Sequence, residues 1–368
     1  MKLLTVIGAR PQFIKAAPFS REFRRNNTEI LVHTGQHYDA NMSEIFFNEL
    51  GIPEPDYNLS IGSASHGKQT GKMLEGIEEI LLKEKPDGLM VYGDTNSTIA
   101  GALAASKLHI PVFHVEAGLR SYNKLMPEEQ NRILTDHISD LLLCPTQTAI
   151  ENLKKEGVTK GVYFTGDIMY DAVLNNVSIA KEKYAKNDIK KVIETENKLD
   201  LDFEKDPYYL ATVHRAENTD NLEKLTNIFK AFNLLDKPVV LPIHPRTKHI
   251  IETLNISKNN ILLISPVGYL EMLYLTSNAS MVITDSGGLQ KEAYFLKTPC
   301  TTLRDQTEWV ETLGNGWNVL SNIVPDEIVE KSQRKFDVSL PQSNAFGDGK
   351  AAEKICKRIE EFCFQNKQ

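Results

Sequence analysis

Short apolar runs alternate along the chain with longer stretches whose apolar residues recur at helical spacing, as in residues 73–81. This alternation is typical of βα units around a parallel sheet, because strands buried on both faces read as continuous Val-, Ile- and Leu-rich runs. The alternation pauses near the middle and then resumes, which predicts an α/β protein with two doubly wound domains. The expected strands are Leu3–Ile7, Glu29–Thr34, Gly88–Tyr92, Pro111–Glu116, Leu141–Cys144, Val162–Thr165, Tyr208–Thr212, Val239–Pro242, Ile261–Ser265, Met281–Thr284 and Cys300–Thr302.

The pause between the two halves is rich in charged residues. Residues 181–205 carry many Lys, Glu, Asp and Asn side chains, which favours a charged helix followed by a connection between domains. At the end of the chain, Ile355, Ile359, Phe362 and Cys363 predict a last amphipathic helix. With 368 residues, each half is long enough to bury its own core.

Composition disfavours several classes of protein. Lys and Arg number 42 and Asp and Glu 49, so the net charge is −7, whereas nucleic-acid binders usually present an electropositive face. No apolar run approaches the roughly 20 residues that cross a bilayer. The four cysteines are scattered and fit no metal-binding spacing. We therefore expect a cytoplasmic protein with reduced thiols, no metal, no membrane segment and no nucleic-acid partner.

Candidate site residues follow the strands, because parallel α/β sheets bind ligands beyond the carboxyl ends of their strands. After the first strand, Gly8 permits a turn, Arg10 lies at its mouth and Lys15 lies one turn into the next helix. The turn lacks two of the three glycines of the dinucleotide fingerprint, so NAD is disfavoured. A plain turn with a solvated arginine is the alternative interpretation.

Carboxylates follow the next strands of the first half. Asp94 and the threonine after it either cap the next helix or take part in chemistry. Glu116 ends an apolar strand and is followed by Arg120, an arrangement that is harder to explain by structure alone. Glu128 and Glu129 begin a helix, where acidic residues are also ordinary partners of the helix dipole.

The second half has matching features that favour an anion. His214 and Arg215 follow one strand, and His244 follows the next. The turn Ser286-Gly287-Gly288 then opens a helix, whose free N–H groups and positive dipole end suit a phosphate. Glu292, farther along this helix, could reach a ribose diol. Together these residues predict a nucleotide-diphosphate site that faces the carboxylates of the first half, where general acid/base chemistry is expected.

Taken together, the motifs resemble the non-hydrolysing UDP-N-acetylglucosamine 2-epimerase family. The resemblance implies a GT-B fold with two doubly wound Rossmann-like domains facing a central cleft. It implies domains of residues 1–173, joined by a C-terminal helix 351–368, and of residues 174–350. It also implies a cytoplasmic homodimer for cell-envelope polysaccharide synthesis and no cofactor. The matching stretches are Gly8–Lys15, Thr34–His37, Gly93–Thr98, His114–Arg120, Pro127–Arg132, His214–Asn218, His244-Pro245 and Asp285–Glu292.

The resemblance also implies an activity and residue roles. The activity is inversion at C2 of a UDP-2-acetamido sugar, as between UDP-GlcNAc and UDP-ManNAc, by elimination and re-addition of UDP through a 2-acetamidoglucal. The family's catalytic positions correspond to Asp94, Glu116, Glu128 and His214. Substrate-binding or cleft-lining positions correspond to Arg10, Lys15, Arg132, Arg215, His244, Ser286, Gly287, Gly288 and Glu292.

Several positions depart from the commonest family pattern. Tyr38 and Ala216 replace arginines, which puts activation by a second substrate molecule in doubt. Lys291 replaces a glutamate, and residues 307–311 read Thr-Glu-Trp-Val-Glu where Thr-Glu-Arg-Pro-Glu is usual. These changes resemble the branch acting on UDP-2,3-diacetamido-2,3-dideoxyglucuronate, and Lys291 is then either a reader of the sugar carboxylate or a solvated helix residue. A GT-B glycosyltransferase using a UDP-sugar donor is the alternative of another class.

Overall fold

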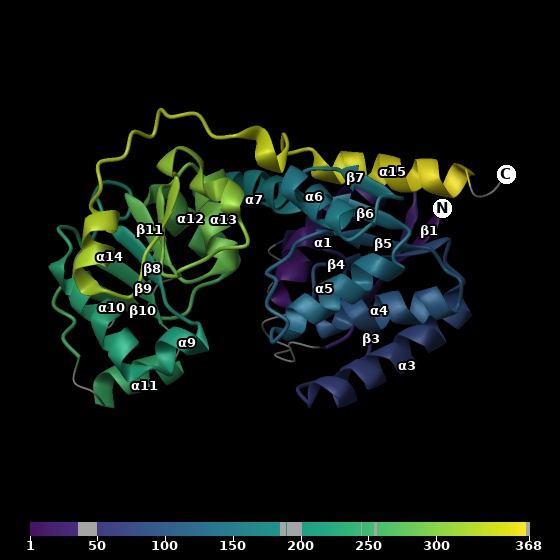
Figure 1. Cartoon of the computed structure of the whole chain (residues 1–368), viewed down its shortest axis with the longest axis horizontal. Helices are drawn as coiled ribbons and strands as arrows, with labels where there is room; N and C mark the ends of the chain where they lie inside the picture. The colour runs from purple at the N-terminus through teal and green to yellow at the C-terminus, as the bar shows by residue number, and fades with distance from the viewer. Residues whose placement is uncertain (36–49, 185–188, 190–200, 244, 254–255, 366–368) are drawn as a thin grey trace. The chain divides into compact units, whose positions relative to one another are not determined.

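The computed structural model describes residues 1–35, 50–184, 189, 201–243, 245–253 and 256–365. The chain divides into two compact units. The first comprises Met1–Ala172 and Asn344–Gln368, and the second comprises Val173–Ser343 (Figure 1).

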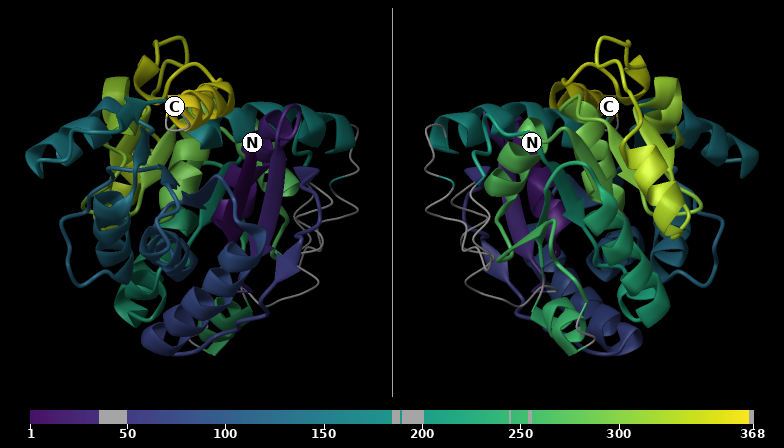
Figure 2. Two further views of the ribbon diagram at one scale, coloured as in Figure 1. Left: turned by 90° about the vertical axis from the view of Figure 1, so that its right-hand side faces the viewer. Right: turned by 90° about the vertical axis from the view of Figure 1, so that its left-hand side faces the viewer.

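The first unit is built on a parallel seven-stranded sheet in the order β3-β2-β1-β4-β5-β6-β7. Strands β1 and β2, purple in Figure 2, run side by side. The order reverses between β1 and β4, which is the switch point where ligands bind in such sheets. The strands are β1 (Lys2–Ile7), β2 (Thr28–His33), β3 (Tyr57–Asn58), β4 (Gly88–Tyr92), β5 (Val112–Val115), β6 (Leu141–Cys144) and β7 (Val162–Phe164).

Helices cover this sheet, and most of them bury one apolar side, whereas α4 is buried along nearly all of its residues. Helices α3, α4 and α5 pack in sequence, and α1 packs against α15. All the apolar residues expected on one face of residues 73–81 are buried in α3, which confirms that helix. The helices are α1 (Arg10–Phe23), α3 (His66–Glu84), α4 (Asn96–Lys107), α5 (Pro127–Ile138), α6 (Gln147–Lys155) and α15 (Ala351–Gln365), and α7 (Ile168–Tyr184) has its first residues in this unit and the rest in the second.

The second unit repeats the plan with a parallel six-stranded sheet in the order β10-β9-β8-β11-β12-β13. Its switch point lies between β8 and β11. The strands are β8 (Tyr209–Thr212), β9 (Val239–Pro242), β10 (Ile261–Ile264), β11 (Met281–Thr284), β12 (Cys300–Thr302) and β13 (Asn318–Leu320). The helices are α9 (Ala216–Thr219), α10 (Leu222–Leu234), α11 (Pro245–Thr253), α12 (Tyr269–Asn278), α13 (Gly287–Phe295) and α14 (Pro325–Ser332), with a 3-10 segment η1 (Val310–Gly316).

The strand predictions are confirmed. Every expected strand is present with its ends within one residue, and β3 and β13 are additional short strands. Residues 181–184 of the expected charged segment lie at the end of helix α7. Most of residues 185–200 lie outside the described part, so the expected charged helix and connection stay predictions.

The last helix belongs to the first unit. Asp171 of α7 accepts the backbone N–H groups of Ala351 (3.0 Å) and Ala352 (2.9 Å), which begin α15. Farther along α15, the ring of Phe362 lies 5.5 Å from that of Phe113 on β5. Two cysteines of this helix, and the two others in the chain, are buried free thiols. Among the described residues, no helix is long and apolar enough to cross a membrane.

Candidate active site

In the first unit, the site is organised around Gly93, which follows β4. Its φ of +61° lies in the left-handed region that favours glycine. The position that a Cβ would take on Gly93 is 3.4 Å from both Lys15 Nζ and Glu116 Oε2. The ammonium of Lys15 on α1 and the carboxylate of Glu116 after β5 form an ion pair here. Sequence-distant groups therefore meet at the carboxyl ends of β1, β4 and β5.

This ion pair is buried, with Lys15 and Glu116 each 9% exposed. Burial strengthens the attraction between the charges and penalises separating them. Glu116 also has a φ of +70°, which for a residue other than glycine costs about 1–3 kcal/mol. Such strain persists only where the surrounding structure enforces it, and it gathers at functional sites.

A second ion pair joins the turn after β4 to helix α5. The guanidinium of Arg132 donates to Asp94 Oδ2 from Nε (3.1 Å) and from a terminal nitrogen, and its other terminal nitrogen donates to Glu129 (2.8 Å). Asn131 of the same helix donates to the backbone oxygen of Asp94 (3.0 Å). Asp94 is therefore held by both its side chain and its backbone.

The two carboxylates that begin α5 have different surroundings. Glu129 is 1% exposed and accepts backbone N–H groups of Ser121 (2.9 Å) and Tyr122 (2.8 Å) in addition to Arg132. The Glu128 side chain is exposed, and within the described residues it makes no hydrogen bond or ion pair. Glu129 thus holds the preceding loop, whereas Glu128 remains available for chemistry.

Gln12 ties the two turns of this site together. Its Oε1 accepts the N–H groups of Gly8 (2.8 Å) and Ala9 (3.0 Å), just before Arg10 begins α1. Its Nε2 donates to the backbone oxygen of Tyr92 (2.9 Å). The turn that carries Arg10 is therefore fixed to the turn that carries Asp94.

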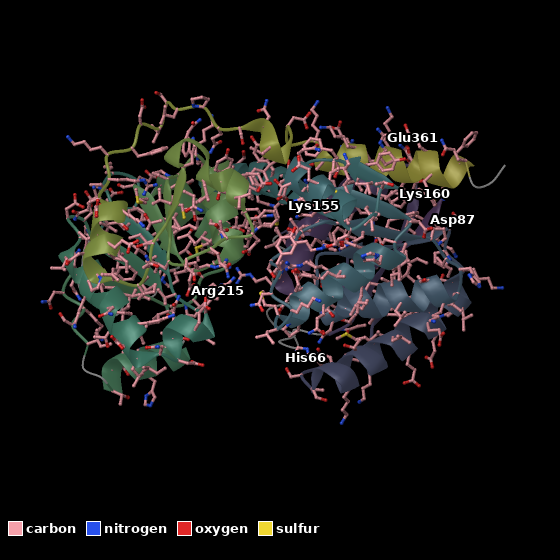
Figure 3. All side chains as sticks on the ribbon, viewed as in Figure 1. His66, Asp87, Lys155, Lys160, Arg215 and Glu361 are labelled. Carbon is pink, nitrogen blue, oxygen red and sulfur yellow. The ribbon has the colours of Figure 1, made fainter. Side chains whose placement is uncertain are left out.

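In the second unit, one buried carboxylate organises the strand ends. Asp285 follows β11 and accepts the backbone N–H of Arg215 (3.0 Å) and the amide of Asn218 (3.0 Å). His214 Nδ1 lies 3.0 Å from Asp285 Oδ1, while the rest of the His214 side chain is exposed. Burial raises the pKa of Asp285, but the hydrogen bond and charge of His214 and the other donors outweigh it, so this pKa lies below its usual value. Arg215, labelled in Figure 3, donates from Nε to the Asp285 backbone oxygen (2.9 Å).

Helix α13 begins directly after Asp285. The hydroxyl of Ser286 accepts the N–H of Leu289 (3.3 Å) and so caps the helix. A Cβ on Gly287 would lie 2.5 Å from Glu308 Oε1, so only glycine fits there without movement. Glu292 lies one turn farther along and is 8% exposed.

A polar cavity of about 390 Å³ lies beyond the carboxyl ends of β12 and β13, against residues of α9 and α10. Asn218, which binds Asp285, forms part of its wall, as do Arg304 and Ser321. The second unit therefore combines a helix N-terminus, cations and polar lining, a combination suited to phosphates and hydroxyl groups.

A model of the UDP-N-acetylglucosamine 2-epimerase family matches residues 21–360. The chain belongs to this family. A UDP-N-acetylglucosamine 2-epimerase homolog from Methanococcus maripaludis is 54% identical, with 96% of this chain and 98% of the relative covered. A UDP-2,3-diacetamido-2,3-dideoxy-D-glucuronate 2-epimerase from Pseudomonas aeruginosa is 50% identical, with 98% and 99% covered.

Solved structures agree with the family assignment. The crystal structure of Methanocaldococcus jannaschii UDP-GlcNAc 2-epimerase in complex with UDP-GlcNAc and UDP matches with a TM-score of 0.85 and 44% identity. It covers 98% of this chain and 100% of that one. These matches confirm the predicted family and the GT-B fold class.

The structure brings several of the predicted site residues into contact with one another. In the first unit, Lys15 meets Glu116 and Arg132 meets Asp94. In the second, His214 and Arg215 meet at Asp285, next to Ser286. Thr95, and not Asp94, caps α4 by accepting the N–H of Thr98 (3.3 Å). His244 and the Gln36–Tyr38 run lie outside the described residues.

Two charged residues have surroundings that the sequence did not indicate. The Arg120 side chain is fully buried between Asp136 and Glu156, with nitrogen–oxygen distances of 2.7 Å to each, so its role is structural. Lys291 is 2% exposed and its Nζ lies 3.6 Å from the ring centroid of Trp309, so the interpretation as a solvated helix residue is wrong. The sequence alone assigns no role to Asp285. Its position directly after a predicted strand is the feature that could have indicated one.

Proposed function

We propose that this protein reversibly inverts C2 of a UDP-2-acetamido sugar, with UDP-GlcNAc and UDP-ManNAc as the first candidate pair. The observation that carries the proposal is the buried Lys15–Glu116 ion pair against Gly93, beside the Asp94–Arg132 pair. In a member of this family, these groups at the switch point of the sheet supply charged acid/base side chains where a sugar ring would bind.

The chemistry explains why several acid/base groups are needed. C1 of the sugar is an acetal carbon, so the hydrogen on C2 is not acidic. Elimination avoids this difficulty: a base takes the C2 proton, the C1–O bond breaks and its electron pair leaves with UDP. The product is a 2-acetamidoglucal beside UDP. Re-addition of UDP at C1, with a proton delivered to the opposite face of C2, completes the inversion.

The residues divide between these tasks. Asp94, Glu116 and Glu128 are the candidate acids and bases in the first unit, and His214 is the candidate in the second. Lys15 forms an ion pair with Glu116, and Arg132 forms one with Asp94, so each cation holds a candidate carboxylate in place.

The second unit is the proposed binding site for UDP. The first turn of α13, with Ser286, Gly287 and Gly288, would hold the diphosphate by its N–H groups and dipole. Glu292 on the same helix would bind the ribose hydroxyls. The cationic residues Arg10 and Arg215, together with His244, would stabilise the charge that develops on departing UDP.

The decisive test is exchange at C2. Incubation of the protein with UDP-GlcNAc in D2O, without an acceptor, should place deuterium at C2 and produce UDP-ManNAc, both visible by NMR. Glu116→Gln should reduce exchange by at least about 10²-fold, as expected for loss of a general acid or base, and leave UDP binding nearly unchanged. The surface variant Glu151→Gln is the matched control and should exchange like the wild type. No exchange by the wild type with either substrate named here would overturn the proposal, and so would a glycosyl transfer that requires an acceptor.

A second candidate substrate is UDP-2,3-diacetamido-2,3-dideoxyglucuronate. The 50% identity to the Pseudomonas relative named for this substrate favours it. The same NMR assay with this nucleotide sugar separates the two, because the physiological substrate should exchange with the higher kcat/KM. The expected homodimer and cytoplasmic location stay predictions, and light scattering should give twice the mass of one chain.

A further inference from the structure

His114 lies beneath the proposed site and has no role in the proposed chemistry. It occupies strand β5, two residues before Glu116, and is fully buried. Its Nε2 lies 2.7 Å from the backbone oxygen of Gly93, and its Nδ1 lies 2.7 Å from Asp136 Oδ1. A carbonyl oxygen can only accept, so Nε2 carries a hydrogen and donates it to Gly93.

The peptide group that His114 contacts lies at the centre of the site. The N–H of Gly93 donates to the backbone oxygen of Val115 (3.0 Å), so both polar groups of Gly93 are bound to residues of β5. The Lys15–Glu116 pair lies against the Cα of Gly93, and Asp94 follows it in the chain. A displacement of the Gly93 peptide therefore moves proposed acid/base groups.

Helix α5 holds the Gly93–Asp94 turn at two places along its length. Near its start, Asn131 and Arg132 bind Asp94, and one turn later Asp136 binds the imidazole that holds Gly93. Asp136 is itself fixed, because Oδ2 accepts from Arg120 (2.7 Å) and from the N–H of Gly118 (3.1 Å). Since α5 also carries Glu128, these bonds set the distance between Glu128 and Asp94.

We propose that His114 is a positioning residue of the epimerisation, which holds the Gly93–Asp94 turn in register through its Nε2–H bond to the Gly93 carbonyl. The proposal rests on the proposed function. Loss of the hydrogen bond from His114 to Gly93 is expected to lower the rate of epimerisation. Asp136 is expected to orient the imidazole ring of His114 for this bond. Misplacement of a reacting group by about 1 Å can reduce a rate about 10²-fold.

Two conservative substitutions separate this role from general stability. The amide nitrogen of His114→Gln can take the place of Nε2 and still donate to Gly93, but Gln has no group at the place of Nδ1. The amide nitrogen of His114→Asn can take the place of Nδ1 and reach Asp136, but Asn is too short to reach Gly93. We expect His114→Gln to retain kcat within about threefold and His114→Asn to lose kcat by roughly 10- to 100-fold, with KM and UDP affinity unchanged in both. Equal losses in both variants, or wild-type kcat in His114→Asn, would overturn the proposal.

Two further variants keep the test informative if both histidine variants unfold. In Asp136→Asn, the amide can accept from Arg120 and Gly118 and donate to Nδ1, which leaves Nε2–H on Gly93, so kcat should stay within about threefold. Arg120 contacts both Asp136 and Glu156. Glu156→Gln weakens the ion pair with Arg120 but leaves the contact between Asp136 and His114, so it should lower Tm without changing kcat. A tenfold loss of kcat in Asp136→Asn would contradict the proposal. Wild-type protein that shows no C2 exchange would instead overturn the proposed function, so the two failures are distinguishable.

Discussion

At the scale of single residues, Asp285 shows how one buried carboxylate shapes a binding surface. It is fully buried, yet its oxygens accept from the backbone of His214 and Arg215 and from the amide of Asn218. These donors come from the segment after β8, whereas Asp285 follows β11, so the carboxylate joins two neighbouring strand ends. The imidazole of His214 is thereby anchored at one nitrogen while its other atoms face solvent.

Asp285→Asn should destabilise the protein in a pH-dependent way. The folded pKa of Asp285 is lowered, so its stabilising contribution is complete above the unfolded pKa of about 3.9 and is lost as pH falls through the lower folded pKa. We expect the variant to lose roughly 2–3 kcal/mol of unfolding free energy at pH 7, since hydrogen bonds to charged groups contribute this much. The difference from wild type should shrink below about pH 4. Urea unfolding at both pH values measures it, and a difference that does not vary with pH would contradict this account.

At the scale of elements, the sequence predicted what periodicity can reveal. The central strands were correct because their long apolar runs reflect burial on both faces, whereas β3 and β13 span two and three residues and leave no pattern. The proposed site residues were found through the rule that ligands bind at strand ends. Contacts were not predictable: a charged residue such as Lys291 reads as exposed, and nothing near it in sequence indicates that Trp309 covers it.

Helix α15 depends on a cap that no local pattern indicates. Asp171 lies 180 residues before Ala351 and accepts the first N–H groups of the helix, groups that have no partner within the helix itself. Asp171→Ala should therefore cost about 1–2 kcal/mol of stability, the usual cost of losing a helix cap. Hydrogen exchange should accelerate most at Ala351 and Ala352. Uniform acceleration throughout the first unit, or none at all, would show that the cap is not the source of the effect.

At the scale of the whole molecule, net charge and local charge have different consequences. The chain carries −7 overall, yet the start of α13 and the nearby Arg215 provide positive potential for an anionic ligand. Each unit also has its own sheet and its own buried apolar cluster. A ligand held mainly by one unit should therefore stabilise that unit more than the other.

The chain carries natural reporters that make this prediction testable. Both tryptophans, Trp309 and Trp317, lie in the second unit, whereas three of the four buried cysteines, Cys144, Cys356 and Cys363, lie in the first. Because most proposed UDP contacts lie in the second unit, UDP at 100 times its Kd should stabilise the tryptophan-reported transition by up to about 2.7 kcal/mol.

The measurement is a guanidinium titration of a Cys300→Ala variant, with and without UDP, followed by tryptophan emission and by thiol labelling. We expect UDP to raise the tryptophan midpoint clearly and the thiol midpoint less. UMP, which lacks the second phosphate, is the control ligand and should shift the tryptophan midpoint less than UDP because the start of α13 then lacks one anionic partner. A thiol midpoint that shifts as much as the tryptophan midpoint would mean that the first unit contributes equally to UDP binding, and Arg10 and Lys15 would then be the residues to substitute first.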